Sequence, residues 1–157
     1  MNLQSVQEGQ TLAPFRLAPS FVARVWGSMS LSPWYQADTS GGPIGEVWLS
    51  GDDCKVLDGP LAGMSFKETI AAKPEAMLGD ADRGVDSPLL LKLIFAREKL
   101  SVQVHPDDKM AQKYGQRRGK TECWYALAAE QDAQVAVGLK AGVTLAEVRE
   151  GIHNGTL

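Results

Sequence analysis

The chain contains the stretch Leu100-Ser101-Val102-Gln103-Val104-His105-Pro106-Asp107-Asp108, whose first six residues alternate between apolar and polar side chains. In a β-strand, successive side chains point to opposite faces of the sheet. The three apolar residues would therefore fill a core, while Ser101, Gln103 and His105 would share a face directed toward a cavity. The alternation predicts a strand with polar ligands on one side.

Two of these polar side chains suit a metal ion. The amide carbonyl of Gln103 and the imidazole of His105 are two residues apart on one face, close enough to bind the same ion. A third ligand is offered by Glu122, which ends the run Gly119-Lys120-Thr121-Glu122 and opens the next apolar stretch. A mixed nitrogen and oxygen set suits zinc or another borderline divalent ion better than a soft thiolate site would.

The same residue types also allow a simpler interpretation. A single histidine in a strand is more often a hydrogen-bonded core or surface residue than a metal ligand. Glu122 beside Lys120 would then be a surface ion pair of little energetic weight. The second histidine, His153, is interpreted as interacting with a helix dipole or with solvent rather than with metal.

Short runs rich in Val, Leu, Ile and Trp recur between clusters of Gly, Pro, Asp and Ser, a punctuation typical of a mainly β protein. The tryptophans Trp26, Trp48 and Trp124 lie in apolar runs, so we expect them in the core rather than as sugar-stacking platforms. We expect strands over residues 21–26, 44–49, 89–95, 100–104, 122–128 and 134–139.

The expected helices are fewer and shorter. Ser65 with Glu68, and Thr144 with Glu147, have the spacing of a capping box, which predicts a helix start at each place. A third helix is expected over residues 107–115. Three apolar residues fall on one face of the last helix, so we expect it to pack against a sheet.

Composition limits the classes of partner. The 157 residues are 44% hydrophobic and 22% charged, enough to bury one core. The net charge is −3 and no Lys or Arg run exceeds two residues, so we expect no nucleic-acid partner and a small ligand instead. The sequence specifies no oligomeric state.

The sequence also bears on location. Residues 1–11 lack the pattern of a signal peptide, and the longest apolar run, residues 89–96, is too short to span a bilayer. Two cysteines without a CxxC spacing favour a reducing compartment. We therefore expect a soluble, cytoplasmic protein without a membrane partner.

Several short sequence blocks, two of which contain the expected ligands, are similar to those of a known family. Gln103-Val104-His105-Pro106-Asp107-Asp108, followed by Gly119-Lys120-Thr121-Glu122-Cys123-Trp124-Tyr125, closely resembles the signature of type I mannose-6-phosphate isomerases. The other blocks that match, in the family's order, are Trp26-Gly27, Ile44-Gly45-Glu46-Val47-Trp48, Gly59-Pro60-Leu61-Ala62-Gly63 and Pro88-Leu89-Leu90-Leu91-Lys92.

The resemblance implies a cupin-like jelly-roll barrel with a few short helices. We expect residues 1–20 to be an N-terminal extension and residues 21–157 to be the N-terminal part of a catalytic domain. In the family, the glutamine, histidine and glutamate of these motifs bind one zinc ion per chain, which maps onto Gln103, His105 and Glu122. The family's second histidine ligand has no match before Leu157, so we expect the domain to be incomplete at its C-terminus.

The resemblance further implies reversible conversion of mannose 6-phosphate to fructose 6-phosphate through a cis-enediol, with zinc as the electrophile. By resemblance Lys92 and Lys120 are pocket residues, and either could transfer protons or hold the phosphate. Ser101 is a plausible phosphate or hydroxyl donor. The alternative for Lys92 is an edge-strand lysine reaching toward water. Glu46 could reach the pocket rim, support a metal ligand or lie on the surface.

Two other functions remain open at this level. The first is a non-catalytic cupin module that binds a sugar phosphate. The second is a cupin enzyme that acts on a different substrate with the same metal site, because a fold does not fix a function.

Overall fold

The structure is a computed structural model that describes residues 12–79 and 87–156. The chain divides into two compact units, Met1–Gln103 and Val104–Leu157, and each is described by itself. Residues 1–11, which belong to the expected N-terminal extension, lie outside the described part.

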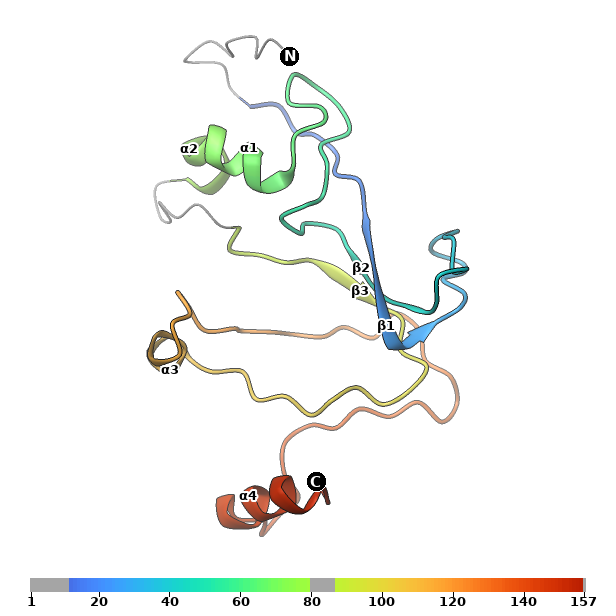
Figure 1. Cartoon of the computed structure of the whole chain (residues 1–157), viewed down its shortest axis with the longest axis vertical. Helices are drawn as coiled ribbons and strands as arrows, with labels where there is room; N and C mark the ends of the chain where they lie inside the picture. The colour runs from blue at the N-terminus through green and yellow to red at the C-terminus, as the bar shows by residue number, and fades with distance from the viewer. Residues whose placement is uncertain (1–11, 80–86, 157) are drawn as a thin grey trace. The chain divides into compact units, whose positions relative to one another are not determined.

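The first unit contains a three-stranded antiparallel sheet in the order β1-β2-β3 (Figure 1). The strands are β1 (Ser20–Ser28), β2 (Ile44–Trp48) and β3 (Lys92–Ile94). The central strand is the most buried, and Val47 at its middle is fully enclosed. Three predicted strands, over residues 21–26, 44–49 and 89–95, are confirmed in place, although β3 is shorter than expected.

The core of this sheet is formed where the central strand meets a loop. Leu31, Ile44 and Val47 make up the buried cluster. Leu93 of β3 and Phe95, which follows β3, pack against it. Val47 pairs directly with Leu93 in the ladder, which places their side chains on one face. Because successive side chains of a strand point to opposite faces, Glu46, the residue before Val47, points to the other face of the sheet.

A glycine allows β1 to cross the start of β2 at close range. Ile44 pairs with both Ala23 and Ser28, so β1 bulges between these two residues. A Cβ atom at Gly27 would lie 2.5 Å from the backbone nitrogen of Gly45. Side chains do not tolerate so close a backbone contact, so position 27 requires glycine.

Two short helices complete the first unit. Helix α1 (Phe66–Ala72) begins as predicted, because the Ser65 hydroxyl accepts from the Glu68 amide and the Glu68 carboxylate accepts from the Ser65 amide. Helix α2 (Pro74–Leu78) was not expected from the sequence; it follows immediately, with a proline in its first turn.

The second unit has helices at both predicted positions (Figure 1). Helix α3 (Asp108–Lys113) is capped by Asp107, and helix α4 (Leu145–Asn154) begins with the predicted Thr144 and Glu147 capping box. The expectation that α4 packs against a sheet is not met among the described residues. Leu145 is 71% exposed and Ile152 is 60% exposed, and α4 buries no residue.

The predictions of strands over residues 100–104, 122–128 and 134–139 are wrong for the described part of the chain. These segments form no β-ladder there, and apolar residues such as Tyr125 and Val137 are each 87% exposed. Alternation suits a segment to a sheet, but a strand forms only where a neighbour supplies matching backbone donors and acceptors. Trp124, expected in the core, is likewise 59% exposed.

No helix in the described ranges combines the length and apolar character needed to cross a bilayer.

Gly27→Ala is expected to lower the free energy of unfolding by about 1–3 kcal/mol, the usual cost of forcing extra atoms into a packed contact. Gly41→Ala is the matched control, because a Cβ atom there meets nothing within 4 Å. Its effect should stay within about 0.5 kcal/mol. Urea unfolding followed by tryptophan fluorescence measures both variants. Equal stability of the two would contradict the close approach at Gly27.

Candidate metal centre

His105 and Glu122, which are distant in sequence, meet in the second unit. The His105 Nε2 atom lies 3.6 Å from Glu122 Oε2, and both side chains are mostly buried, with 26% and 20% of their surfaces exposed. The structure thus brings two of the predicted site residues together.

Two further side chains contact the same carboxylate. The Lys120 ammonium lies 2.8 Å from Glu122 Oε2, and the Trp124 indole N–H donates to Glu122 Oε1. Each carboxylate oxygen thus has a partner that fixes its direction. The sequence pattern did not reveal the role of Trp124, although its spacing two residues after Glu122 could have indicated a shared face.

The position of Glu122 depends on how its segment is attached to the segment before α3. A Cβ atom at Gly119 would lie 2.4 Å from the carbonyl oxygen of Pro106, so only glycine permits the contact. The Asp108 carboxylate accepts from the Gly119 amide at 2.8 Å, and the Lys120 amide donates to the Pro106 carbonyl at 3.1 Å. These contacts join the segment that carries His105 to the segment that carries Glu122.

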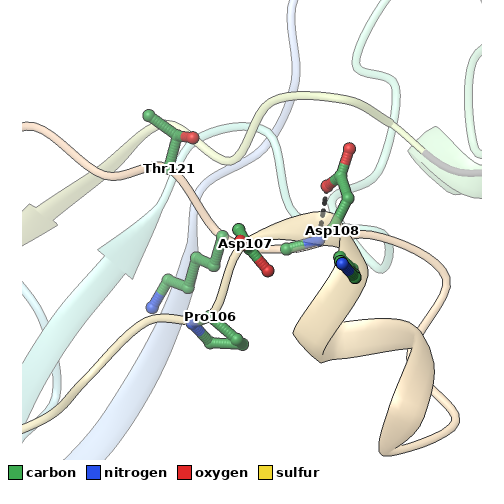
Figure 2. A pocket seen from close by; sticks show the side chains of 7 residues that line it. Pro106, Asp107, Asp108 and Thr121 are labelled. Carbon is green, nitrogen blue, oxygen red and sulfur yellow. Dashed lines mark hydrogen bonds between the residues drawn. The ribbon is translucent and has the colours of Figure 1, made fainter.

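A hollow of about 390 Å³ lies at this junction. Figure 2 shows Thr121 on one side and Pro106, Asp107 and Asp108 on the other, with a dashed line marking the hydrogen bond to Asp108. The residues lining it are Pro106, Asp107, Asp108, Lys109, Gly119, Lys120 and Thr121. The hollow therefore opens beside Lys120, one of the two lysines predicted to serve the site.

The spacing of two donor atoms in the second unit is compatible with zinc as a ligand pair. Two ligand atoms bound to one tetrahedral zinc ion are about 3.4 Å apart, given metal–ligand bonds of about 2.0–2.2 Å. The 3.6 Å between His105 Nε2 and Glu122 Oε2 is close to this value. An imidazole nitrogen and a carboxylate oxygen are also donors that zinc accepts.

Gln103 and Ser101 belong to the end of the first unit. The Gln103 amide nitrogen donates to the Ser101 hydroxyl at 3.0 Å. This hydrogen bond leaves the Gln103 carbonyl oxygen as the atom that a metal would use. Both residues are exposed.

Glu46 carries a buried carboxylate at the centre of the sheet in the first unit. Its Oε1 atom lies 2.6 Å from the Lys92 ammonium, and its Oε2 atom lies 2.6 Å from an Arg24 nitrogen. The Trp48 indole also donates to Oε2 at 3.3 Å. Only 7% of the Glu46 side chain is exposed, which excludes the surface interpretation.

Opposing effects act on this carboxyl group. Burial alone would raise the pKa of Glu46, but the hydrogen bond and charge of Lys92 lower it, aided by the Trp48 hydrogen bond and the charge of Arg24. The net result is a pKa below the usual range of a glutamate. Glu46 is therefore ionised at neutral pH.

Comparison with known proteins places these features in a family. Residues 14–147 match the family described as phosphomannose isomerase type I, catalytic domain. Over 147 residues the chain is 36% identical to the probable mannose-6-phosphate isomerase GmuF of Bacillus subtilis, covering 90% of this chain and 46% of that protein. It is 32% identical to the mannose-6-phosphate isomerase of Streptococcus mutans, covering 82% of this chain and 41% of that protein.

A solved structure is similar as well. The crystal structure of the mannose 6-phosphate isomerase from Bacillus subtilis matches with a TM-score of 0.79 and 29% sequence identity, covering 92% of this chain and 46% of that one. The chain thus spans about half the length of the relatives that it matches.

The fold class is mainly β and cupin-like, with a few short helices, as the sequence predicted. Within that class, the chain belongs to the type I phosphomannose isomerase family.

Asp108→Ala is expected to remove protection of the Gly119 amide against hydrogen exchange, because the carboxylate that accepts from this amide is lost. Asp107→Ala is the matched control, since its carboxylate accepts from the Met110 amide at 2.8 Å instead. Hydrogen exchange measured by NMR should be faster at the Gly119 amide in Asp108→Ala and faster at the Met110 amide in Asp107→Ala. Faster exchange at Gly119 in the Asp107 variant alone would contradict this assignment.

Proposed function

We propose that this chain provides the metal-binding part of a metal-dependent aldose–ketose isomerase that interconverts mannose 6-phosphate and fructose 6-phosphate. The proposal rests mainly on the distance of 3.6 Å between His105 Nε2 and Glu122 Oε2. Membership of the type I phosphomannose isomerase family supports the substrate and the reaction.

The metal in this proposal is zinc, one ion per chain, held by Gln103, His105 and Glu122. Among the described residues, no group of three His, Cys, Asp or Glu side chains could hold a metal ion. The Gln103 amide oxygen is the third donor in this proposal, because an oxygen of this kind can bind a borderline divalent ion. When bound, zinc would supply an electrophile that polarises the sugar carbonyl.

The proposed reaction requires proton transfer between two carbons. A base removes the proton from C2 of the open-chain aldose to form a cis-enediol, and the proton is returned to C1 while the hydroxyl proton moves from O2 to O1. Lys92 and Lys120 are the proposed catalytic residues of this chain. The Lys120 ammonium lies beside Glu122 and at the edge of the hollow, where it can also bind substrate.

The sugar phosphate must also be held in place. Ser101 is proposed as a hydroxyl donor, because its oxygen accepts from Gln103 and its own hydrogen remains available to a ligand. Lys120 is proposed to assist in binding through its charge.

His105→Ala is expected to abolish stoichiometric zinc binding and, with it, turnover of mannose 6-phosphate, because the nitrogen ligand is removed. His153→Ala is the matched control, since His153 lies in the last turn of α4. Elemental analysis of the purified chain gives the zinc content, and a coupled isomerase assay gives turnover.

Unchanged zinc content in His105→Ala would contradict the proposed ligand set. Zinc and mannose 6-phosphate binding without turnover in the unsubstituted chain would instead support the non-catalytic sugar-phosphate-binding module. Equal loss of zinc in the His153 variant would show that the effect is not specific to His105.

A further inference from the structure

The two oxygens of the Glu122 carboxylate have different partners within the second unit. The Trp124 indole N–H donates to Oε1. The Lys120 ammonium and His105 Nε2 lie 2.8 Å and 3.6 Å from the other oxygen, Oε2. All four residues belong to the second unit. One oxygen is therefore held by the tryptophan, while the other faces the imidazole of the proposed metal ligand.

A glutamate followed two residues later by a tryptophan also occurs in β2, where it has a different outcome. The Trp48 indole donates to Glu46 Oε2 at 3.3 Å, and the Lys92 ammonium lies 2.6 Å from Oε1. An Arg24 nitrogen adds a second cation at 2.6 Å from Oε2, so cations of the sheet contact both oxygens. At Glu122 the oxygen opposite the indole faces an imidazole, a side chain that binds zinc. The comparison distinguishes a carboxylate enclosed by cations from one directed at a metal ligand.

An indole is well suited to hold a carboxylate beside a metal site. Its N–H group donates a hydrogen bond and accepts none, so it does not compete for the metal. A hydrogen bond to an ionised carboxylate is stronger than one between neutral groups. Only 20% of the Glu122 side chain is exposed, which limits competition from water. Trp124 itself is 59% exposed, so packing in a core does not account for its position.

The hydrogen bond to Oε1 limits how Glu122 can bind an ion. A carboxylate binds a metal ion through one oxygen or through both. Binding through both places them at similar distances from the ion, so the group would have to turn until Oε1 also faces the ion. That turn would break the contact with the Trp124 indole. The favoured arrangement uses Oε2 alone, the oxygen that already lies 3.6 Å from His105 Nε2.

We infer that Trp124 is a positioning residue that restricts Glu122 to binding the metal ion through a single oxygen, Oε2, and this inference rests on the proposed metal site. Binding through one oxygen keeps the coordination number low, as tetrahedral zinc requires, and leaves a position for water or substrate. Larger ions such as calcium take about six to eight oxygens and often both oxygens of one carboxylate. Trp124 therefore favours a small, tetrahedral ion.

Trp124→Phe removes the N–H donor and keeps an aromatic ring at an exposed position, so the chain should fold as before. Its zinc affinity, measured by competition with a chromophoric chelator, should fall about 10–100-fold, the usual effect of losing the partner that orients a metal ligand. Tyr125→Phe is the matched control. This neighbouring side chain is 87% exposed, and loss of its hydroxyl should leave zinc affinity unchanged.

Cobalt(II) in place of zinc reports the coordination of the ion directly, because tetrahedral cobalt absorbs visible light more strongly than cobalt with more ligands. Trp124→Phe should absorb more weakly per bound cobalt than the unsubstituted chain, since Glu122 can then add its second oxygen. Tyr125→Phe should keep the original spectrum. A tryptophan that merely stabilised its segment would change the amount of cobalt bound but not the spectrum of the bound ion.

A readout without metal tests the contact between the indole and the carboxylate. In NMR spectra of nitrogen-labelled tryptophan, the Trp124 indole N–H resonance should move upfield in Glu122→Ala, because the N–H group loses its charged acceptor. The Trp48 indole donates to Glu46 instead, so its resonance should stay in place and serves as the internal control.

Each result bears on a different part of the inference. An unmoved Trp124 resonance or an unchanged zinc affinity in Trp124→Phe would overturn the positioning role. An unchanged cobalt spectrum in that variant would overturn the restriction to one oxygen. In these cases the proposed metal site would stand, whereas an unsubstituted chain that binds neither zinc nor cobalt would defeat the proposed site and this inference together.

Discussion

The buried carboxylate of Glu46 is the constraint on which the first unit depends. An anion in the middle of a sheet is stable only when cations and donors reach it, and Arg24, Trp48 and Lys92 do so from all three strands. The same requirement restricts the register of the sheet, because a slip of one residue would turn Lys92 to the opposite face. Packing of Val47 on the other face enforces that register from the apolar side.

The second unit relies on close backbone contact rather than on buried charge. Gly119 touches the backbone of Pro106, and the Asp108 carboxylate holds its amide. This contact gives a physical reason for motif residues that are not themselves ligands, since it fixes the segment that ends at Glu122. The glycine and the aspartate position the segment that carries Glu122, one of the proposed metal ligands.

The two units differ in the chemistry of their charged residues. The second unit offers a nitrogen donor and a carboxylate with a lysine beside them, and the first offers a sheet face with a surplus positive charge.

The sequence by itself determined the starts of α1, α3 and α4 and the positions of the three strands of the sheet. These features depend on local patterns, such as the apolar runs between turn residues and the capping boxes at Ser65 and Thr144. Local patterns are visible in a chain read on its own. Only the tertiary structure decided that Glu46 is buried and paired with Lys92, and that residues 122–128 form no ladder in the described part of the chain. Burial and strand pairing depend on which distant segments come together, and alternation specifies only the faces of a segment, not its neighbours.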